Sequence, residues 1–142
     1  METMSAAPCG KSARARPVIL VADDFSDARE LYQEFLELEG FDVVLASNGR
    51  EAVDRARETQ PDLVLMDLSM PVLDGYGATE QLKEDAATRD IPVVALSGHV
   101  MPRHGAEARD AGCETVLPKP CLPTEVAAKI RSLLHASRPK TS

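Results

Sequence analysis

The stretch Pro17-Val-Ile-Leu-Val-Ala-Asp-Asp24 joins a continuous apolar run to two adjacent carboxylates. The apolar run is typical of a strand that is covered on both faces, because such a strand carries Val, Ile and Leu without polar alternation. The two acids repel each other, by roughly 4 kcal/mol at about 4 Å under an effective dielectric near 20. A positive partner is therefore expected close to Asp23 and Asp24.

Two further apolar runs also end in a polar side chain. Asp62-Leu-Val-Leu-Met-Asp67 ends in a carboxylate, and Val93-Val-Ala-Leu-Ser97 ends in a hydroxyl. Shorter runs at Phe41–Ala46 and Thr115–Leu117 are also expected to be strands, and Lys119 follows the second of them. The sequence therefore predicts several strands that each deliver a polar group at the carboxyl end.

Helical spacing of apolar residues predicts helices that alternate with these strands. The expected helices cover residues 26–39, 49–58, 76–84, 102–111 and 124–135. Ser26 or Asp27, Asn48 and Thr124 are the expected N-caps, and Gly40 is expected to stop the first helix. This alternation indicates an α/β fold, a doubly wound parallel sheet, because parallel neighbours need crossover helices.

The chain is expected to form one domain. Its 142 residues are 44% hydrophobic and 27% charged, which is ordinary for a globular protein. We expect residues 17–135 to form the domain, 1–16 a flexible N-terminal extension and 136–142 a flexible C-terminal tail. The net charge of −7 argues against direct nucleic-acid binding, and no apolar run approaches the ~20 residues of a membrane span.

The cysteines and the N-terminus indicate a cytoplasmic location. Cys9, Cys113 and Cys121 are odd in number and lack the spacing of a metal site, which fits a reducing compartment. The first 16 residues lack the apolar segment of a secretory signal. No disulfide framework is expected.

The polar residues at the strand ends can converge, because ligands of such sheets bind at the carboxyl edge. Asp23, Asp24 and Asp67 together suit Mg²⁺, which takes one or two carboxylates directly and keeps waters. That ion is then the expected positive partner. Asp67 stands alone on its strand and is the expected nucleophile toward phosphorus, with Ser97 and Lys119 holding the oxygens of the phosphoryl group.

Taken singly, each of these residues has a simpler interpretation. An Asp after a strand is often a helix cap or a turn former, Ser97 before Gly98 can be a turn, and Lys119 can be a solvated loop charge. Their joint occurrence, in order and each at a strand end, favours the chemical interpretation.

Four motifs show a family resemblance. They are Val21-Ala-Asp-Asp-Phe25, Leu65-Met-Asp-Leu-Ser-Met-Pro-Val-Leu-Asp-Gly75, Ala95-Leu-Ser-Gly98 and Leu117-Pro-Lys-Pro120. From about Pro17 to Leu134 the chain resembles the receiver domain of bacterial response regulators, including the CheY-like single-domain members. The resemblance implies a flavodoxin-like (βα)5 fold with strand order 2-1-3-4-5.

The resemblance also implies a chemical role for the acids. Asp67 would accept a phosphoryl group from the phosphohistidine of a histidine kinase or phosphotransfer protein. Asp24 would contact Mg²⁺ directly, Asp23 largely through water, and Asp67 and the backbone carbonyl of Ser69 would complete the protein ligands. The domain would then catalyse only its own phosphorylation and dephosphorylation.

Further roles follow from the same resemblance. Ser97 would move toward the phosphoryl group, Lys119 would pair with it, and small Gly98 would leave the site accessible. The peptide bond before Pro120 is a candidate for the cis form. Ser69 and His99 occupy positions that tune the lifetime of the phosphate, although His99 can also be an exposed loop histidine without a role.

The chain departs from the family at the switch position. Val116 stands three residues before Lys119, where the family usually carries Tyr or Phe. Valine has no ring to swing inward, so the usual aromatic switch is in question while the phosphorylation chemistry is not.

The expected function is a phosphorylation-dependent receiver of a two-component system or phosphorelay. Its output would pass through protein contacts to an unidentified downstream target, by a monomer or weak homodimer with no membrane contact. One alternative is a receiver segment of a larger hybrid kinase. Another is a phosphatase-like enzyme with an aspartyl nucleophile, although Leu68 and Ser69 after Asp67 do not match the Asp-x-Asp-x-Thr motif of the haloacid dehalogenases. A third is a degenerate flavodoxin-like binding domain.

Overall fold

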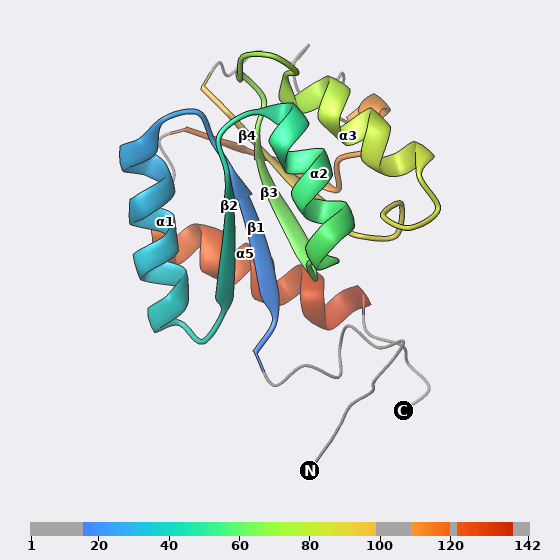
Figure 1. Cartoon of the computed structure of the whole chain (residues 1–142). Helices are drawn as coiled ribbons and strands as arrows, with labels where there is room; N and C mark the ends of the chain where they lie inside the picture. Colours follow the sequence, from blue (N-terminus) through green and yellow to red (C-terminus); the bar gives the residue numbers. More distant parts are fainter. Residues whose placement is uncertain (1–15, 99–108, 120–121, 138–142) are drawn as a thin grey trace.

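The computed structural model describes residues 16–98, 109–119 and 122–137, which form a parallel five-stranded sheet with helices on both faces (Figure 1). The strand order is β2-β1-β3-β4-β5. The strands are β1 (Val18–Ala22), β2 (Asp42–Ala46), β3 (Leu63–Asp67), β4 (Val93–Ser97) and β5 (Thr115–Pro118). The α/β fold and the order 2-1-3-4-5 are therefore confirmed.

The helices fall close to the expected ranges. They are α1 (Ser26–Leu38), α2 (Gly49–Thr59), α3 (Gly75–Glu84) and α5 (Pro123–Ser137). Residues 109–111 are also helical, whereas the rest of the helix expected over 102–111 lies outside the described residues. In the part of the chain that the structure describes, no helix has the length and apolar character needed to cross a membrane.

The apolar runs decide which strands are central. Every residue of β3 and β4 is buried, whereas β2 and β5, at the sheet edges, are partly exposed. Strands buried on both faces need continuous apolar sequence, which β1, β3 and β4 supply. β2 is added on one side of β1, and β3 and the later strands are added on the other side. The order in which strands are added to the sheet therefore reverses between β1 and β3. A ligand site is expected at such a switch point.

Two apolar layers hold the helices to the sheet. Tyr32 and Leu36 of α1 pack with Ile130 of α5 on one face. Val53 of α2 and Leu82 of α3 pack on the opposite face. Figure 1 shows α2 and α3 together on one side of the sheet and α1 and α5 on the other. Fully burying a side chain of this size contributes about 1.5 to 3 kcal/mol, so the two layers are the main source of stability.

The predicted end signals are correct for α2 and for the end of α1. The Asn48 side chain accepts the Glu51 N–H at 2.8 Å, as expected of an N-cap. Gly40 has φ of +102°, a conformation that favours glycine, directly after the C-cap of α1. The sequence did not predict that Asp74 caps α3, where its side chain accepts the Gly77 N–H at 2.9 Å.

The expected cap of α1 was wrong. The N-cap is Phe25, and Ser26 is already the first helical residue. Asp23 replaces the expected cap, because its Oδ1 accepts the Phe25 N–H at 2.9 Å while the Phe25 carbonyl accepts the Arg29 N–H at 3.1 Å. A residue expected to be a metal ligand therefore also fixes the start of α1.

The expected limits of α5 were also wrong. The helix begins at Pro123, so Thr124 lies within it and is not its cap. Proline suits the first helical position because its φ is already helical and no N–H is lost. At the other end α5 continues to Ser137, so residues 136 and 137 of the expected flexible tail are helical. The other residues of both expected extensions, apart from Arg16, lie outside the described residues.

The first turn of α3 packs against the end of β3. A Cβ atom at Gly75 would lie 2.4 Å from the Asp67 carbonyl oxygen and 2.7 Å from Leu68 Cα. A Cβ atom at Gly77 would instead lie 2.7 Å from Cδ1 of Leu73, the end of a flexible side chain. Of these two glycines, only Gly75 faces backbone atoms, which cannot move independently of the chain.

We therefore predict that Gly75→Ala lowers the free energy of unfolding by about 1 to 3 kcal/mol, because the new methyl group forces β3 and α3 apart. Gly77→Ala is the matched control in the same helix. It is expected to be neutral or to stabilise by up to about 1 kcal/mol, since alanine has the higher helix propensity. Urea unfolding followed by circular dichroism compares the two. Equal effects of the two substitutions would contradict this account of the loop.

Candidate active site

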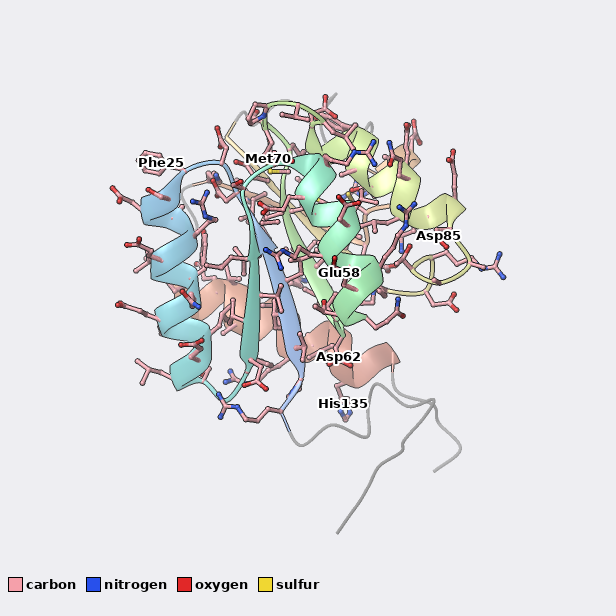
Figure 2. The ribbon with its side chains drawn as sticks, in the orientation of Figure 1. Phe25, Glu58, Asp62, Met70, Asp85 and His135 are labelled. Carbon is pink, nitrogen blue, oxygen red and sulfur yellow. The ribbon has the colours of Figure 1, made fainter. Side chains whose placement is uncertain are left out.

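The acidic residues expected to act together meet at the carboxyl edge of the sheet. Ala22 of β1 pairs with Met66 of β3, so Asp23 and Asp67, one residue further along each strand, are neighbours. The exposed Asp24 completes a group of three acids in which one carboxylate oxygen from each residue lies within 4.8 Å of the other two. Figure 2 shows Phe25 and Met70 at this end of the sheet, with Asp62 and His135 at the other end.

Lys119 is the positive partner of two of these acids in this structure. Its Nζ lies 3.0 Å from Asp23 Oδ2 and 3.3 Å from Asp67 Oδ2. The backbone brings it there, because the Lys119 N–H donates to the Ser97 carbonyl at 2.7 Å just beyond the paired ends of β4 and β5. Burial lowers the pKa of Lys119, but the hydrogen bond to Asp23 and the charges of both acids outweigh burial and leave the pKa raised. The amine is therefore held as an ammonium.

Asp67 is almost fully buried, with 4% of its surface exposed. Its Oδ1 accepts the Ser69 N–H at 3.1 Å, and its Oδ2 faces Lys119. Burial raises its pKa to about 6; the Ser69 N–H opposes this rise, Asp23 adds to it, and Lys119 again opposes it. The Ser69 N–H and Lys119 thus offset only part of the effect of burial and of Asp23 on the ionised Asp67.

Asp23 differs from Asp24 in its surroundings. Asp23 is buried, and its carboxylate is occupied on one oxygen by the Phe25 N–H at 2.9 Å and on the other by Lys119. Asp24 is exposed, and its side chain points to no partner among the contacts described. The exposed carboxylate is the one most open to a cation from solvent.

The donor set fits a hard divalent cation. Three carboxylates that converge within 4.8 Å suit Mg²⁺, which prefers oxygen ligands. A single ammonium also balances only part of three negative charges. The arrangement therefore matches a magnesium site better than a purely structural ion-pair cluster.

The structure brings most of the other predicted residues to the same edge. Ser97 is buried at the end of β4, and at Gly98, which follows it, no atom of the described residues lies within 4 Å of an added Cβ. Ser69 is exposed in the loop after β3, with its N–H directed at Asp67. His99 and Pro120 lie outside the described residues, so their expected roles stay predictions.

Val116 is not beside the acids. It pairs with Ala95 in the sheet and packs, half-buried, against the apolar layer under α2 and α3. It fills space at the switch position but has no ring that could move.

One residue at the site was missed by sequence reasoning. Arg29, on α1, donates from Nη1 to the Asp23 carbonyl at 2.7 Å. An arginine on the first turns of a helix has no sequence signal for this contact, because the partner is a backbone atom.

Comparison with known proteins decides the family. Residues 19–131 match the model of the response regulator receiver domain. The chain belongs to the response regulator receiver family. A polar-differentiation response regulator, DivK of Brucella anthropi, is 34% identical over 116 residues, which is 82% of this chain and 94% of DivK. The present chain is thus a receiver domain of two-component signalling.

Solved receiver domains agree with this membership. One from a signal transduction histidine kinase of Syntrophus aciditrophicus is 31% identical, with a TM-score of 0.80, and the match covers 89% of this chain and 96% of that one. Another, from a sensor histidine kinase of Pseudomonas aeruginosa, is 28% identical, with a TM-score of 0.79 and coverage of 85% and 99%. That structure holds a magnesium ion in its active-site cleft. The family therefore provides a precedent for a cation at such a cleft.

The raised pKa of Asp67 leads to a prediction about stability without metal. Because its folded pKa of about 6 exceeds its ordinary value of 3.8, the stability contribution present below pH 3.8 is lost as pH rises through 6. In EDTA at pH 7.5, Asp67→Asn is expected to raise the free energy of unfolding by about 1 to 2 kcal/mol. The gain is expected to shrink toward zero near pH 4.

Asp24→Asn serves as the control, because this acid is exposed and its replacement relieves less repulsion. Urea unfolding at pH 4, 5.5 and 7.5 gives the comparison. A gain for Asp67→Asn that does not change with pH would contradict the assigned protonation.

Proposed function

We propose that this receiver takes a phosphoryl group onto Asp67, with Mg²⁺ held by Asp23, Asp24, Asp67 and the backbone carbonyl of Ser69. The observation that carries the proposal is the position of Lys119, whose Nζ lies 3.0 Å from Asp23 and 3.3 Å from Asp67. An ammonium beside a buried carboxylate next to a hard-cation donor set matches the needs of phosphoryl transfer.

The reaction divides the work among these residues. A carboxylate oxygen of Asp67 forms a bond to phosphorus while the bond from phosphorus to the donor breaks, and the donor's imidazole nitrogen keeps that electron pair. The ammonium of Lys119 and the hydroxyl of Ser97 donate hydrogen bonds to the phosphoryl oxygens. Mg²⁺, when bound, would neutralise part of the negative charge of the three carboxylates. The product is an acyl phosphate on Asp67.

The proposed donor is the phosphohistidine of a histidine kinase or phosphotransfer protein, and the domain would catalyse only its own phosphorylation and dephosphorylation. The relatives are named as a response regulator and as receiver domains of histidine kinases, so both a separate regulator and a hybrid-kinase segment fit. The output would be a protein contact in the cytoplasm, made by a monomer or weak homodimer. At Gly98 no atom of the part of the chain that the structure describes lies within 4 Å of an added Cβ, which is consistent with an accessible phosphorylation site.

Phosphorylation by acetyl phosphate tests the proposal. With Mg²⁺ the wild-type chain is expected to gain the mass of one phosphoryl group, and Asp67→Asn is expected to gain none. Lys119→Met and Ser97→Ala are expected to slow the gain, by about 100-fold for Lys119, because a donor to the developing charge is lost. Intact-mass spectrometry over time gives the rates.

Asp54→Asn is the matched control, since it removes an exposed acid from α2, away from the site. It is expected to behave as the wild type. Phosphorylation that persists in Asp67→Asn would refute the assignment. Steady release of phosphate from a free phosphoester over many turnovers would instead favour the phosphatase-like alternative.

Val116 leads to a separate prediction. Val116→Ala is expected to lower the free energy of unfolding by about 1 kcal/mol, because the side chain packs against the core. The rate of phosphorylation is expected to stay at the wild-type value, since no ring has to move for Asp67 to react. The acetyl phosphate assay and urea unfolding measure the two effects. A large fall in the phosphorylation rate would assign Val116 a part in the chemistry.

A further inference from the structure

We propose that Arg29 is a positioning residue for the acidic site: it holds the peptide between Asp23 and Asp24 as part of a closed ring of interactions that ties the site to α2. The inference rests on the proposed function, because it concerns how the cation ligands are held. Arg29 touches neither the phosphoryl group nor the carboxylates in this account. It acts through a backbone carbonyl.

The first half of the ring joins β1 to α1. The Arg29 guanidinium, half-buried, donates to the Asp23 carbonyl oxygen at 2.7 Å. This carbonyl belongs to the peptide bond that precedes Asp24, so holding it fixes the direction in which the Asp24 side chain leaves the backbone. The N–H of Asp23 donates to the Ala46 carbonyl at 3.1 Å, which ties the same segment to the end of β2. The N–H of Asp23 is therefore held by the backbone of Ala46, and its carbonyl is held by the Arg29 side chain.

The second half returns through α2. Glu51 Oε1 accepts the Ser47 N–H at 2.6 Å and the Ser47 hydroxyl at 2.8 Å. These two bonds from Ser47 lower the pKa of Glu51; burial opposes them, and the charges of Arg55 and Arg29 lower it further. Glu51 is thus a carboxylate close enough to attract Arg29, and Ser47 directly follows Ala46. Hydrogen bonds and the chain itself join Arg29, Asp23, Ala46, Ser47 and Glu51, and electrostatic attraction between Glu51 and Arg29 completes the ring.

This ring explains why an arginine contact lies beside a site that we propose to bind a cation. A positive charge near Mg²⁺ weakens cation binding by repulsion, whereas correct placement of Asp24 strengthens it. Glu51 offsets the charge of Arg29 and leaves its hydrogen-bonding geometry in use. The net effect of Arg29 in this account is tighter cation binding.

Arg29→Met separates placement from simple charge, and Glu51→Gln, combined with it, tests whether Glu51 acts through Arg29. Arg29→Met removes a positive charge, and Glu51→Gln removes a negative charge while its amide oxygen can still accept from Ser47. If only charge mattered, Arg29→Met would tighten Mg²⁺ binding and Glu51→Gln would weaken it. If the ring positions Asp24, both weaken binding, and the effects in the double variant are smaller than the product of the single effects.

The experiment measures the Mg²⁺ dissociation constant of the full chain by calorimetry, with the melting temperature in EDTA measured alongside. Arg29→Met is expected to weaken Mg²⁺ binding about three- to tenfold, the size expected for one charge-assisted hydrogen bond. Arg29→Lys is expected to restore part of the affinity. Arg55→Met is the matched control: Arg55 forms an ion pair with Glu51, at 3.8 Å, from within α2 itself, and its replacement is expected to leave the affinity unchanged.

The acetyl phosphate assay completes the test. In Arg29→Met the phosphorylation rate is expected to fall at low Mg²⁺ and to recover at saturating Mg²⁺. Tighter or unchanged Mg²⁺ binding in Arg29→Met overturns the inference, as does an equal loss in Arg55→Met. Because these comparisons are made against a wild type that binds Mg²⁺ and is phosphorylated, a failure of the proposed function appears first in the wild type and is distinct from a failure of the ring.

Discussion

The ammonium of Lys119 lies between two carboxylates that come from neighbouring strands, and the rest of the site depends on this contact. Asp23 and Asp67 are both buried, and the charge of Asp23 adds to the rise that burial causes in the pKa of Asp67. Lys119 corrects only part of this imbalance, because the pKa of Asp67 still rises to about 6. The remaining negative charge would favour the divalent cation that we propose for this site. A buried ion pair that leaves negative charge uncompensated contributes little to stability and is typical of functional sites.

The sheet topology makes this contact possible between residues far apart in sequence. Because β1 lies between β2 and β3, Asp23 and Asp67 sit side by side although a strand and two helices separate them in the chain. The pairing of β4 with β5 then sets the end of the last strand beside Ser97, and the Lys119 N–H bonds the Ser97 carbonyl. The lysine side chain only has to reach across the carboxyl edge. Chemical groups at the ends of four strands, β1, β3, β4 and β5, are thus brought together by backbone pairing.

The parts of the fold and site that depend on local sequence were predictable, and those that depend on tertiary contacts were not. Apolar runs that end in Asp67 or Ser97 identify both the strands and the chemical edge, because burial demands apolar residues and the edge permits polar ones. The predicted N-cap of α1 was wrong because Asp23, which lies outside the helix, accepts the Phe25 N–H. The partner of Asp23 was expected to be an ion, yet Lys119 already occupies that position, and its reach cannot be read from sequence. Arg29 was missed for the same reason, since its partner is a carbonyl.

The two loops that carry the acids share one neighbour, the first turn of α2. Glu51 accepts hydrogen bonds from Ser47 in the segment after β2, and its charge attracts Arg29, which donates to the Asp23 carbonyl. On the other side, a Cβ atom at Gly49 would lie 1.9 Å from the carbonyl oxygen of Leu73, so the loop after β3 rests directly on the backbone of α2. Because close-packed backbone cannot be compressed, a rearrangement of either loop has to be accommodated at this turn. Val116, by contrast, packs against the apolar layer under α2 and α3 and has no aromatic ring that could move.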